Sequence, residues 1–408
     1  MSMASRSSLA EIRQQFPSLQ SGEIFMDNAG GSQVPASVAD AVRDYMLTSY
    51  VQTGAEYPAS ARATQTVADA HAMVNTIMGG DAVGRTIFGS SSSMLCRILA
   101  ESYADSFQHG DEVVVAESGH EANVGPWVNL RRRGVEVKIW KADPETGVCQ
   151  LSELQNLLTP RTKVVAFVHV SNILGQVEQV RPCIEAAHAV GARVVLDGVA
   201  YAPHLLVDVE AWNVDWYVFS CYKVFGPHIG AMFGKHEAFA ELTGPNHYFL
   251  PKDYLPAKFE LGGANHESCA GLLGLKPYLS YLAESNRFSR ETVVQAWKRM
   301  EELEAPLTHQ FLEFLASKPR VRVFGNPVAD RSRVPTISFR HESASPKQIA
   351  SRALEAGIGM RHGNFYSVRL LERMGIDPSE GVARASFAHY NTPEEVDQLC
   401  QSLDEILD

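Results

Sequence analysis

The sequence lacks the features that define several large classes of protein. No apolar run in its 408 residues approaches the roughly 18 residues that a membrane-spanning helix needs. Basic residues are outnumbered, 36 Lys and Arg against 47 Asp and Glu, and a formal net charge of −11 argues against nucleic acid or an anionic membrane as the main partner. The first sixteen residues contain no apolar stretch of the kind a secretory signal has. We therefore expect a cytoplasmic protein.

Cysteine is also scarce and irregularly spaced. The six cysteines are Cys96, Cys149, Cys183, Cys221, Cys269 and Cys400. They show neither metal-ligand spacing nor the density of a disulfide framework, so we expect no metal site and a reducing compartment. Hydrophobic residues make up 45% and charged residues 20% of the chain, which is typical of a globular protein. The length favours one large domain and a smaller one.

Short β-rich runs alternate with helical patterns from about residue 65 to residue 235. The predicted strands are residues 86–88, 112–116, 136–140, 163–168, 193–196, 216–219 and 231–234. Several of them, VVVA and VVAFV among others, are apolar throughout, which is typical of parallel strands buried on both faces. Helical stretches such as 151–158 and 181–190 lie between them. The pattern predicts an α/β domain whose ligands bind beyond the carboxyl ends of its strands.

After about residue 270 the pattern changes to that of a smaller α+β domain. A long, highly charged helix is predicted at about 286–314. It is followed by predicted strands at 334–340, 358–361 and 382–387, and by a last helix at 393–406. We therefore divide the chain into an N-terminal segment (1–30) packed with the small domain, a large domain (31–280) and a small C-terminal domain (281–408).

Asp197 and Lys223 are the strongest pair of candidate functional residues. Asp197 closes one predicted strand and Lys223 follows the next, so the two should lie side by side at one edge of the sheet. A lysine close to Phe219 and Phe225 should be partly desolvated, which lowers its pKa and favours Schiff-base chemistry. A buried aspartate needs a cationic partner, for which a pyridinium nitrogen is suitable. A structural ion pair between the two residues is the alternative, and these residues alone do not decide between a functional and a structural role.

Three further features follow other predicted strands. The segment FGSSSS (88–93) combines a glycine and several hydroxyls with the start of a helical pattern at Met94, which would suit a phosphate group. A serine-rich helix cap that binds nothing is the alternative. His120 and Asn172 follow the strands predicted at 112–116 and 163–168, although a single histidine in such a loop is more often a surface residue.

Taken together, these motifs resemble those of the fold-type I pyridoxal-phosphate enzymes, specifically the class V aminotransferase and cysteine desulfurase group. The resemblance runs from FMDNAGGSQVP (25–35) to ASFAHYNTPEEVDQL (385–399). It implies the type I fold of PLP-dependent transferases, with a mostly parallel sheet in the large domain that binds the cofactor. It also implies pyridoxal 5'-phosphate as the cofactor and a homodimer with shared active sites.

The resemblance assigns a role to each candidate residue. Lys223 is expected to form the internal aldimine and to move protons at the substrate Cα, and Asp197 to keep the pyridine nitrogen protonated. His120 is expected to stack on the cofactor ring, and Asn172 to contact its phenolic oxygen. Arg384 matches the arginine that binds the substrate carboxylate.

The phosphate and the remaining substrate contacts follow by the same resemblance. The hydroxyls expected at the phosphate are those of Ser90, Ser91, Ser220 and Tyr222. Tyr222 stands where close relatives carry a histidine. Gly263 and His266 belong to a segment (262–267) that is expected to reach the neighbouring subunit's phosphate. Ala29 and His362 are expected to contact the substrate, together with Arg384 and Asn172.

The sequence departs from the desulfurase pattern at the loop that supplies the nucleophilic cysteine. Desulfurases carry RTGHHC there, whereas this chain has RHGNFY (361–366), so Tyr366 replaces the cysteine. A phenol cannot accept sulfane sulfur, so no persulfide is expected unless Cys221 or Cys269 takes part. The chain is more similar to a desulfurase-like branch without that cysteine, which shares its segments DGVAYAPH (197–204) and SCYKVFGPH (220–228).

The resemblance implies an enzyme that acts on an L-amino acid through an external aldimine and a quinonoid. We favour a C–S lyase that releases the sulfur of cysteine or a cysteine derivative by β-elimination, with Tyr366 or His362 as the general acid. A carbon–carbon bond-forming enzyme that works by substitution or condensation is an alternative, as is an aminotransferase or an epimerase. A non-catalytic scaffold is disfavoured, because Lys223 and Asp197 are retained.

Overall fold

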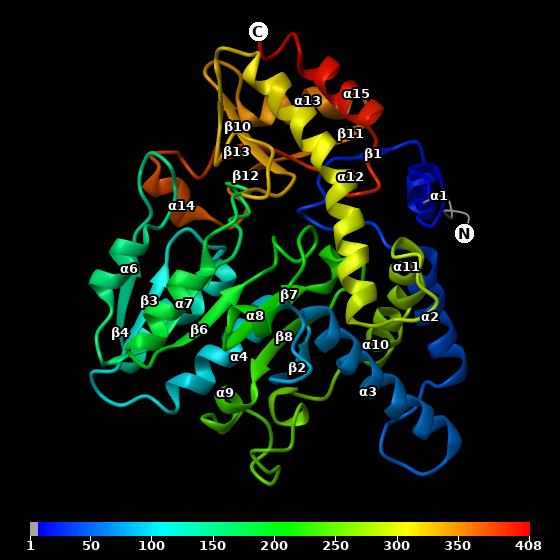
Figure 1. Cartoon of the computed structure of the whole chain (residues 1–408). Helices are drawn as coiled ribbons and strands as arrows, with labels where there is room; N and C mark the ends of the chain where they lie inside the picture. Colours follow the sequence, from blue (N-terminus) through cyan, green and yellow to red (C-terminus); the bar gives the residue numbers. More distant parts are fainter. Residues whose placement is uncertain (1–6) are drawn as a thin grey trace.

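A seven-stranded sheet forms the centre of the computed structural model, which describes residues 7–408 (Figure 1). The strand order is β2-β8-β7-β6-β5-β3-β4. The strands are β2 (Gly84–Gly89), β3 (Glu112–Ala116), β4 (Glu136–Trp140), β5 (Thr162–Val168), β6 (Arg193–Asp197), β7 (Trp216–Ser220) and β8 (Gly230–Lys235). Only β8 runs antiparallel to its neighbours, β2 and β7. The prediction of a mostly parallel α/β sheet is confirmed.

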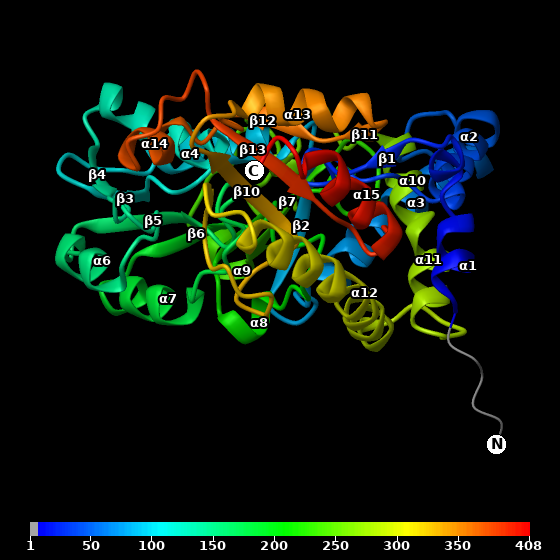
Figure 2. The ribbon, with the colours of Figure 1, turned by 90° about the horizontal axis from the view of Figure 1, so that it is seen from above.

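Each face of this sheet is covered by its own apolar core. Along β3, Val113 and Val115 pack with Leu99 of α4 (Ser92–Ala104), whereas Val114 packs in the core that contains Ile184 of α7 (Val180–Ala189). Successive side chains of a strand point to opposite faces, so a strand buried on both sides must be apolar throughout. This explains the continuous apolar runs. Figure 2 shows α4 and α7 on opposite sides of the strands.

The other helices of the first 283 residues connect and cover these strands. They are α1 (Leu9–Gln14), α2 (Ala36–Thr48), α3 (Pro58–Met78), α5 (Gly125–Val128), α6 (Leu151–Leu157), α8 (Val209–Trp212), α9 (His236–Ala240), α10 (His266–Leu273) and α11 (Leu275–Leu282). Short 3-10 helices occur at η1 (Pro17–Gln20), η2 (Glu121–Asn123), η3 (Asn129–Arg133), η4 (Cys221–Lys223) and η5 (Ala257–Phe259). The segment η4 directly follows β7 and ends at Lys223, so it places this lysine at the edge of the sheet.

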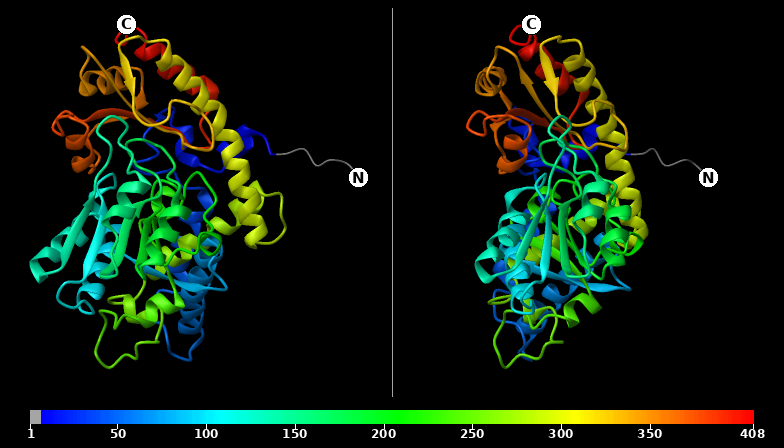
Figure 3. Two further views of the ribbon diagram at one scale, coloured as in Figure 1. Left: turned by 60° about the vertical axis from the view of Figure 1, so that its left-hand side comes forward. Right: turned by 90° about the vertical axis from the view of Figure 1, so that its left-hand side faces the viewer.

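A second, antiparallel sheet is built from the C-terminal part of the chain. Its order is β12-β13-β10-β9, with β9 (Val321–Val323), β10 (Thr336–His341), β12 (Arg361–Gly363) and β13 (Val382–Ser386). The helices α13 (Pro346–Glu355), α14 (Val368–Arg373) and α15 (Pro393–Leu403) accompany it. Figure 3 shows this smaller sheet above the large one. Because Arg384 of β13 reaches the backbone of Asn172 beyond β5, the smaller sheet lies over the edge where the parallel strands end.

The single strand predicted at 358–361 is wrong, because the structure has two strands there. The first, β11 (Ile358–Gly359), pairs in parallel with β1 (Ile24–Phe25), and the second, β12, pairs with β13. The chain therefore changes partners at Met360. Met26 continues from β1 into the apolar core of the smaller sheet. The domain boundaries at 30 and 280 stay a prediction, and residues 1–6 of the N-terminal segment lie outside the described residues.

The long helix α12 (Arg290–Ala316) extends from beside α11 to the smaller sheet (Figure 1). It begins later than the predicted residue 286, because Ser289 caps it by accepting a hydrogen bond from the Thr292 amide at 3.3 Å. Near one end Trp297 donates a hydrogen bond to the Ala202 carbonyl at 2.8 Å, and near the other end Phe311 packs in the core of the smaller sheet. Among the helices of residues 7–408, none combines the length and the apolar composition of a membrane span.

Candidate active site

Asp197 and Lys223 lie at the same edge of the large sheet. The strands β6 and β7 are parallel neighbours: Asp197, the last residue of β6, lies opposite Val218, and β7 ends two residues later at Ser220. Asp197 is only 3% exposed, and its Oδ1 accepts a hydrogen bond from the Val199 amide at 3.0 Å. No ion pair to this carboxylate occurs within residues 7–408. Burial raises the pKa of Asp197 to about 6, against the opposing effects of the Val199 hydrogen bond and the charge of Lys223.

Lys223 is placed without a hydrogen-bond partner of its own among the described residues. Its Nζ lies 5.9 Å from the centre of the Tyr222 ring. Burial lowers the pKa of Lys223 to about 8, and the charge of Arg384 lowers it further, while Asp197 and Asp27 raise it. An amine with this pKa is partly neutral at mildly alkaline pH, which is the form that attacks a carbonyl.

His120 follows β3 and caps η2, because its Nδ1 accepts a hydrogen bond from the Ala122 amide at 3.0 Å. Burial lowers the pKa of His120 to about 4, and the charges of Lys223 and Arg384 act in the same direction. The ring is therefore neutral at physiological pH and carries its proton on Nε2. Its centre lies 5.2 Å from that of the Tyr366 ring. A neutral, flat imidazole at this position could stack on an aromatic ligand.

Arg384 is buried in β13, and only some of its hydrogen-bond donors have partners among the described residues. Its Nη2 donates to Asp27 Oδ1 at 3.1 Å and its Nη1 to the Asn172 carbonyl at 3.3 Å, while Nε has no hydrogen-bond partner in the described part of the chain. The guanidinium lies over the Phe365 ring, with Cζ 3.8 Å from the ring centre. Burial lowers the pKa of Arg384 to about 10, so the guanidinium stays charged. A buried, unpaired donor on a cation is suited to a carboxylate ligand.

Asn172 holds the loop that follows β12. Its Nδ2 donates to the Phe365 carbonyl at 2.9 Å, and its Oδ1 accepts from the Ser367 hydroxyl at 2.9 Å. Phe365 and Tyr366 both have left-handed backbone conformations, with φ of 49° and 60°. Such conformations are strained for residues other than glycine and need support from their surroundings. The role of Asn172 at the cofactor's phenolic oxygen stays a prediction, because both ends of its amide are engaged with this loop.

A pair of hydroxyls lies at the start of α4. Ser92 Oγ and Ser220 Oγ are 2.8 Å apart and buried. Ser91 caps the helix by accepting a hydrogen bond from the Met94 amide at 3.1 Å, and Ser90 is exposed. Gly230 allows this close packing, because a Cβ there would lie 2.4 Å from the Ser91 backbone. The free amides at the start of a 13-residue helix, together with these hydroxyls, fit a phosphate.

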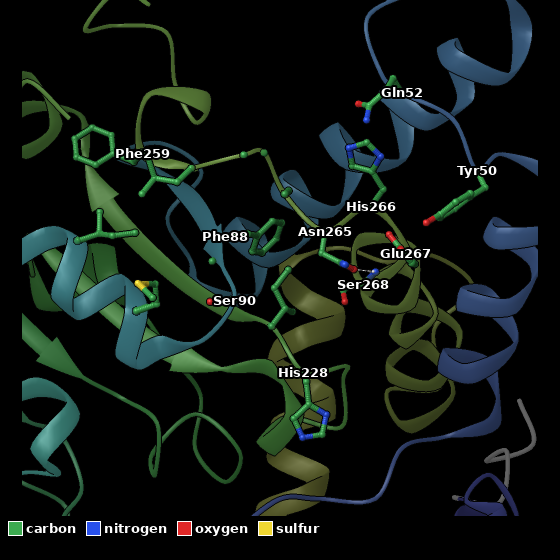
Figure 4. A pocket seen from close by; sticks show the side chains of 18 of the residues that line it. Tyr50, Gln52, Phe88, Ser90, His228, Phe259, Asn265, His266, Glu267 and Ser268 are labelled. Carbon is green, nitrogen blue, oxygen red and sulfur yellow. Dashed lines mark hydrogen bonds between the residues drawn. The ribbon is translucent and has the colours of Figure 1, made fainter. Parts of the chain in front are cut away.

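Three of the remaining predicted residues line one cavity. Ser90, Gly263 and His266 line this cavity together with His228, and its volume is about 850 Å³ (Figure 4). Lys223, Asp197 and Arg384 are not among its lining residues.

Three more of the predicted residues lie outside this cavity. Tyr222 stacks on His228 at 4.7 Å. Ala29 is buried and donates its amide to Ser386 Oγ at 2.8 Å. His362 is exposed on β12.

Sequence reasoning missed three residues that contribute to the site. Asp27 lies within FMDNAGG, where an acidic residue directly after an apolar run was an available signal. Ser92 is one position beyond the predicted Ser91, and only the observed start of α4 separates their roles. No sequence pattern indicated Phe365 as a site residue, because its contact with Arg384 joins two separate segments of the smaller sheet.

Comparisons with known proteins match this arrangement over nearly the whole chain. The sequence model of the family described as aminotransferase class-V matches residues 24–399. The chain is 36% identical to the aminotransferase-like protein FGM3 of Gibberella zeae, over 98% of both chains. It is 31% identical to the cysteine desulfurase-like protein ustD of Aspergillus flavus, over 97% of this chain and 90% of the relative. The crystal structure of the cysteine desulfurase CsdA of Escherichia coli superimposes with a TM-score of 0.83 and 25% identity, over 99% of this chain and 100% of that one.

The fold and these matches define a fold-type I enzyme that depends on pyridoxal phosphate. The chain belongs to the class-V aminotransferase family. The residues present fit the cofactor: Asp197 is a buried carboxylate without a cationic partner among the described residues, Lys223 has a lowered pKa, and the start of α4 offers hydroxyls and free amides. Asp197 would face the pyridine nitrogen, Lys223 the aldehyde carbon, and Ser92 with Ser220 the phosphate.

Proposed function

We propose that the protein is a lyase that cleaves the Cβ–S bond of cysteine or a cysteine derivative. The observation that carries the proposal is the placement of Lys223, with a pKa lowered to about 8, beside the buried Asp197 and within the electrostatic reach of Arg384. Support also comes from relatives named as cysteine desulfurases or as similar to them, including one of Dickeya dadantii that is 32% identical over 97% of this chain.

Each of the three residues has a distinct task in this proposal. Arg384 binds the substrate carboxylate through its unpaired Nε and so fixes which bond at Cα is broken. Lys223 removes the proton from Cα, for which a pKa near the working pH is favourable. Asp197 holds a proton at the pyridine nitrogen. Pyridoxal phosphate, when bound, supplies the electron sink for the negative charge that develops at Cα.

The sulfur leaves without forming a persulfide on the protein. Tyr366 occupies the position of the desulfurase cysteine, and five of the six cysteines are buried. Burial raises the pKa of both Cys221 and Cys269, the two thiols that could have replaced it. Tyr366, whose ring contacts His120, or the exposed His362 would protonate the departing sulfur.

We also infer that two copies of the chain form a homodimer around the cavity of Figure 4. Tyr50, Met94 and Leu261 line this cavity and are 63%, 44% and 54% exposed. Apolar side chains gathered at one opening favour a protein partner over solvent. In such a dimer Gly263 and His266 would complete the phosphate site of the neighbouring subunit.

A spectroscopic and product assay on the holoenzyme tests the lyase proposal. The visible band of the bound cofactor is followed during additions of L-cysteine, cysteine S-conjugates, their sulfoxides and L-alanine. We expect one of the sulfur compounds to shift the band and to yield pyruvate and ammonia. A shifted band without pyruvate would contradict elimination. A product that contains a second carbon fragment would then indicate carbon–carbon bond formation, and a keto acid or D-amino acid would indicate transamination or epimerisation.

A further inference from the structure

A buried histidine–glutamate pair joins α3 to the segment that follows η5. His71 Nε2 of α3 lies 2.7 Å from Glu260 Oε1, and the two side chains are only 12% and 4% exposed. The other ring nitrogen of His71, Nδ1, lies 2.7 Å from the Val67 carbonyl. A carbonyl only accepts hydrogen bonds, so Nδ1 donates, and the contact with the carboxylate needs a second proton on Nε2. The geometry is therefore that of an imidazolium paired with a carboxylate.

The carboxylate of Glu260 also holds the strand that leads to the phosphate-binding hydroxyls. Its Oε1 accepts a hydrogen bond from the Phe88 amide at 2.6 Å, and the ring centres of Phe88 and His71 are 4.3 Å apart. The strand β2 is the first in the order of the large sheet, and its one neighbour among the described strands is β8. The Phe88 amide on the outer side of β2 is therefore held by Glu260, two residues before Ser90.

Glu260 also fixes the start of the segment 261–267. Its carbonyl accepts a hydrogen bond from the Gly263 amide at 3.2 Å. Residues of both segments line the cavity of Figure 4, Phe88 from the first and Gly263 and His266 from the second. A single ion pair thus connects the two segments that the cofactor phosphate is expected to need.

Other ionisable groups around α3 do not replace this pair. Burial raises the pKa of the Cys269 thiol on α10, and the charge of Glu260 raises it further, so the thiol stays neutral. Lys258 donates to two backbone carbonyls, at 3.0 Å each. Within residues 7–408 neither member of the pair has a second ion pair. The charged groups of the other elements packed on α3 are exposed or have different contacts: Arg85 of β2 is exposed, Lys235 of β8 donates to the Asn213 carbonyl, Arg290 of α12 donates to the Ile77 carbonyl, and Glu267 of α10 acts on the Cys269 thiol.

We propose that His71 and Glu260 are positioning residues for the cofactor phosphate, and that His71 must be protonated to fulfil this role. With the proton in place, Glu260 holds the Phe88 amide and so keeps the start of α4 in the arrangement that binds phosphate. When His71 loses this proton as pH rises, a nitrogen lone pair faces the carboxylate and the link to α3 is lost. The inference concerns cofactor binding and does not depend on the reaction that follows. Only its extension to 261–267, which would order the neighbouring subunit's phosphate contact, rests on the proposed homodimer.

Binding of pyridoxal 5'-phosphate and of pyridoxal, which lacks the phosphate, separates positioning from folding. Both are titrated into the cofactor-free protein, and the ratio of their dissociation constants measures the contribution of the phosphate site. His71→Gln removes the charge and should lower the wild-type preference for the phosphate ester about tenfold, as expected for the loss of a charge-assisted hydrogen bond. Glu260→Gln should have the same effect, and the two changes together should cost little more than either alone.

His188→Gln is the matched control, because the chain contains a second pair of the same construction. His188 Nε2 lies 2.7 Å from Asp215 Oδ2, which accepts a hydrogen bond from the Val194 amide at 2.8 Å. Val194 is near the start of β6, at the edge of the sheet opposite to Asp197. This substitution should lower the melting temperature and leave the binding ratio unchanged.

The same ratio is measured from mildly acidic to mildly alkaline pH. The wild-type preference for the phosphate ester should fall relative to that of His71→Gln as pH rises, because only the wild type loses the proton. The ionisations of the cofactor phosphate and of Lys223 are common to both proteins, so the difference isolates His71.

The outcomes separate this inference from the lyase and dimer proposals. Unchanged ratios in both variants, an equal loss in His188→Gln, or parallel pH profiles would overturn the role of His71. Failure of the His71 and Glu260 variants to fold, beside a folded control, would make the pair a structural one and also overturn it. A ratio that depends on His71 in a protein without C–S cleavage would support the positioning role and refute the lyase. The same ratio in a protein that sediments as a monomer would refute the dimer alone.

Discussion

The edge of the large sheet and the loop after β12 build the site in opposite ways. At the sheet edge, Asp197 and Ser220 are the last residues of buried parallel strands, and Lys223 follows one turn later. The loop instead contains two consecutive strained residues, Phe365 and Tyr366, held by side-chain contacts from Asn172.

This difference separates two tasks. Strand ends fix positions tightly because they belong to a core packed on both faces. A loop that depends on a few hydrogen bonds can change its residues without disturbing that core. The strand ends at Asp197 and Ser220 should therefore tolerate fewer substitutions than the loop at 361–366. Substitutions in the two regions should accordingly have effects of different size and kind.

The largest effect is expected from Lys223→Ala. Loss of the proton carrier at Cα should lower kcat by about 10²- to 10⁴-fold or more and remove the visible band of the bound cofactor. Lys276→Ala is the control, because that lysine contacts Phe288 and lies outside the site. A variant that keeps its band and its turnover would place the reacting lysine elsewhere.

Asp197→Asn should alter both activity and the pH dependence of stability. Loss of the charge should lower kcat roughly 10- to 100-fold. In the cofactor-free protein the pKa of Asp197 is raised to about 6 from an ordinary 3.8, so the folded state binds the extra proton between these values. Wild-type stability should therefore fall as pH rises through this window, by about 3 kcal/mol.

Thermal unfolding of the cofactor-free proteins from pH 4 to pH 8 measures this effect. The melting temperature of Asp197→Asn, relative to that of the wild type, should increase as pH rises. Parallel curves for the two proteins would show that the carboxylate is not destabilised by its burial.

Phe365→Leu tests the loop region with a smaller expected effect. Leucine keeps most of the buried volume but lacks the π face that covers Arg384 at 3.8 Å. A desolvated contact of this kind is worth about 2 kcal/mol, so KM for the amino acid should rise roughly thirtyfold with little change in kcat. Phe324→Leu, at a second arginine–phenylalanine contact on the smaller sheet, should leave KM unchanged. A fall in kcat alone would mean that Phe365 does not act through Arg384.

The smallest effect is expected from Ser92→Ala. Loss of one hydroxyl hydrogen bond to the bound phosphate should cost about 0.5–1.5 kcal/mol, which weakens cofactor binding roughly two- to tenfold. Ser90→Ala is the matched control at an exposed hydroxyl. Equilibrium dialysis of the cofactor compares the two variants, and a larger loss for Ser90→Ala would reverse the assignment of the phosphate hydroxyl.

The sheet-edge region was predictable from the sequence to a large extent. The predicted ranges match β3 and β4 residue for residue and β6 to within one residue. The rule that parallel strands end at one edge then brings Asp197 and Lys223 together. The cysteine desulfurase resemblance then supplied the cofactor. The serine that caps α4 was harder to predict from the sequence, because the roles of Ser91 and Ser92 depend on the residue at which α4 begins.

The loop region was predictable only in part. The resemblance predicts Tyr366 at the position of the desulfurase cysteine, and that remains a prediction. The pairing of Arg384 with Asp27 is not visible in the sequence, because 357 positions separate them. The same holds for the amide contacts of Asn172 with residues beyond β12, and for the exchange of partners at Met360 that splits one predicted strand into two. Such long-range contacts have no local periodicity, so no pattern in the sequence could indicate them.

The identity of the lysine that holds the cofactor can be measured directly. The holoenzyme is reduced with borohydride, which fixes the cofactor on its lysine, and the digested protein is mapped by mass spectrometry. We predict that the added mass lies on the peptide that contains Lys223 and on no other. Labelling of a different lysine, or of none after incubation with pyridoxal phosphate, would contradict the placement of the active site at the ends of β6 and β7.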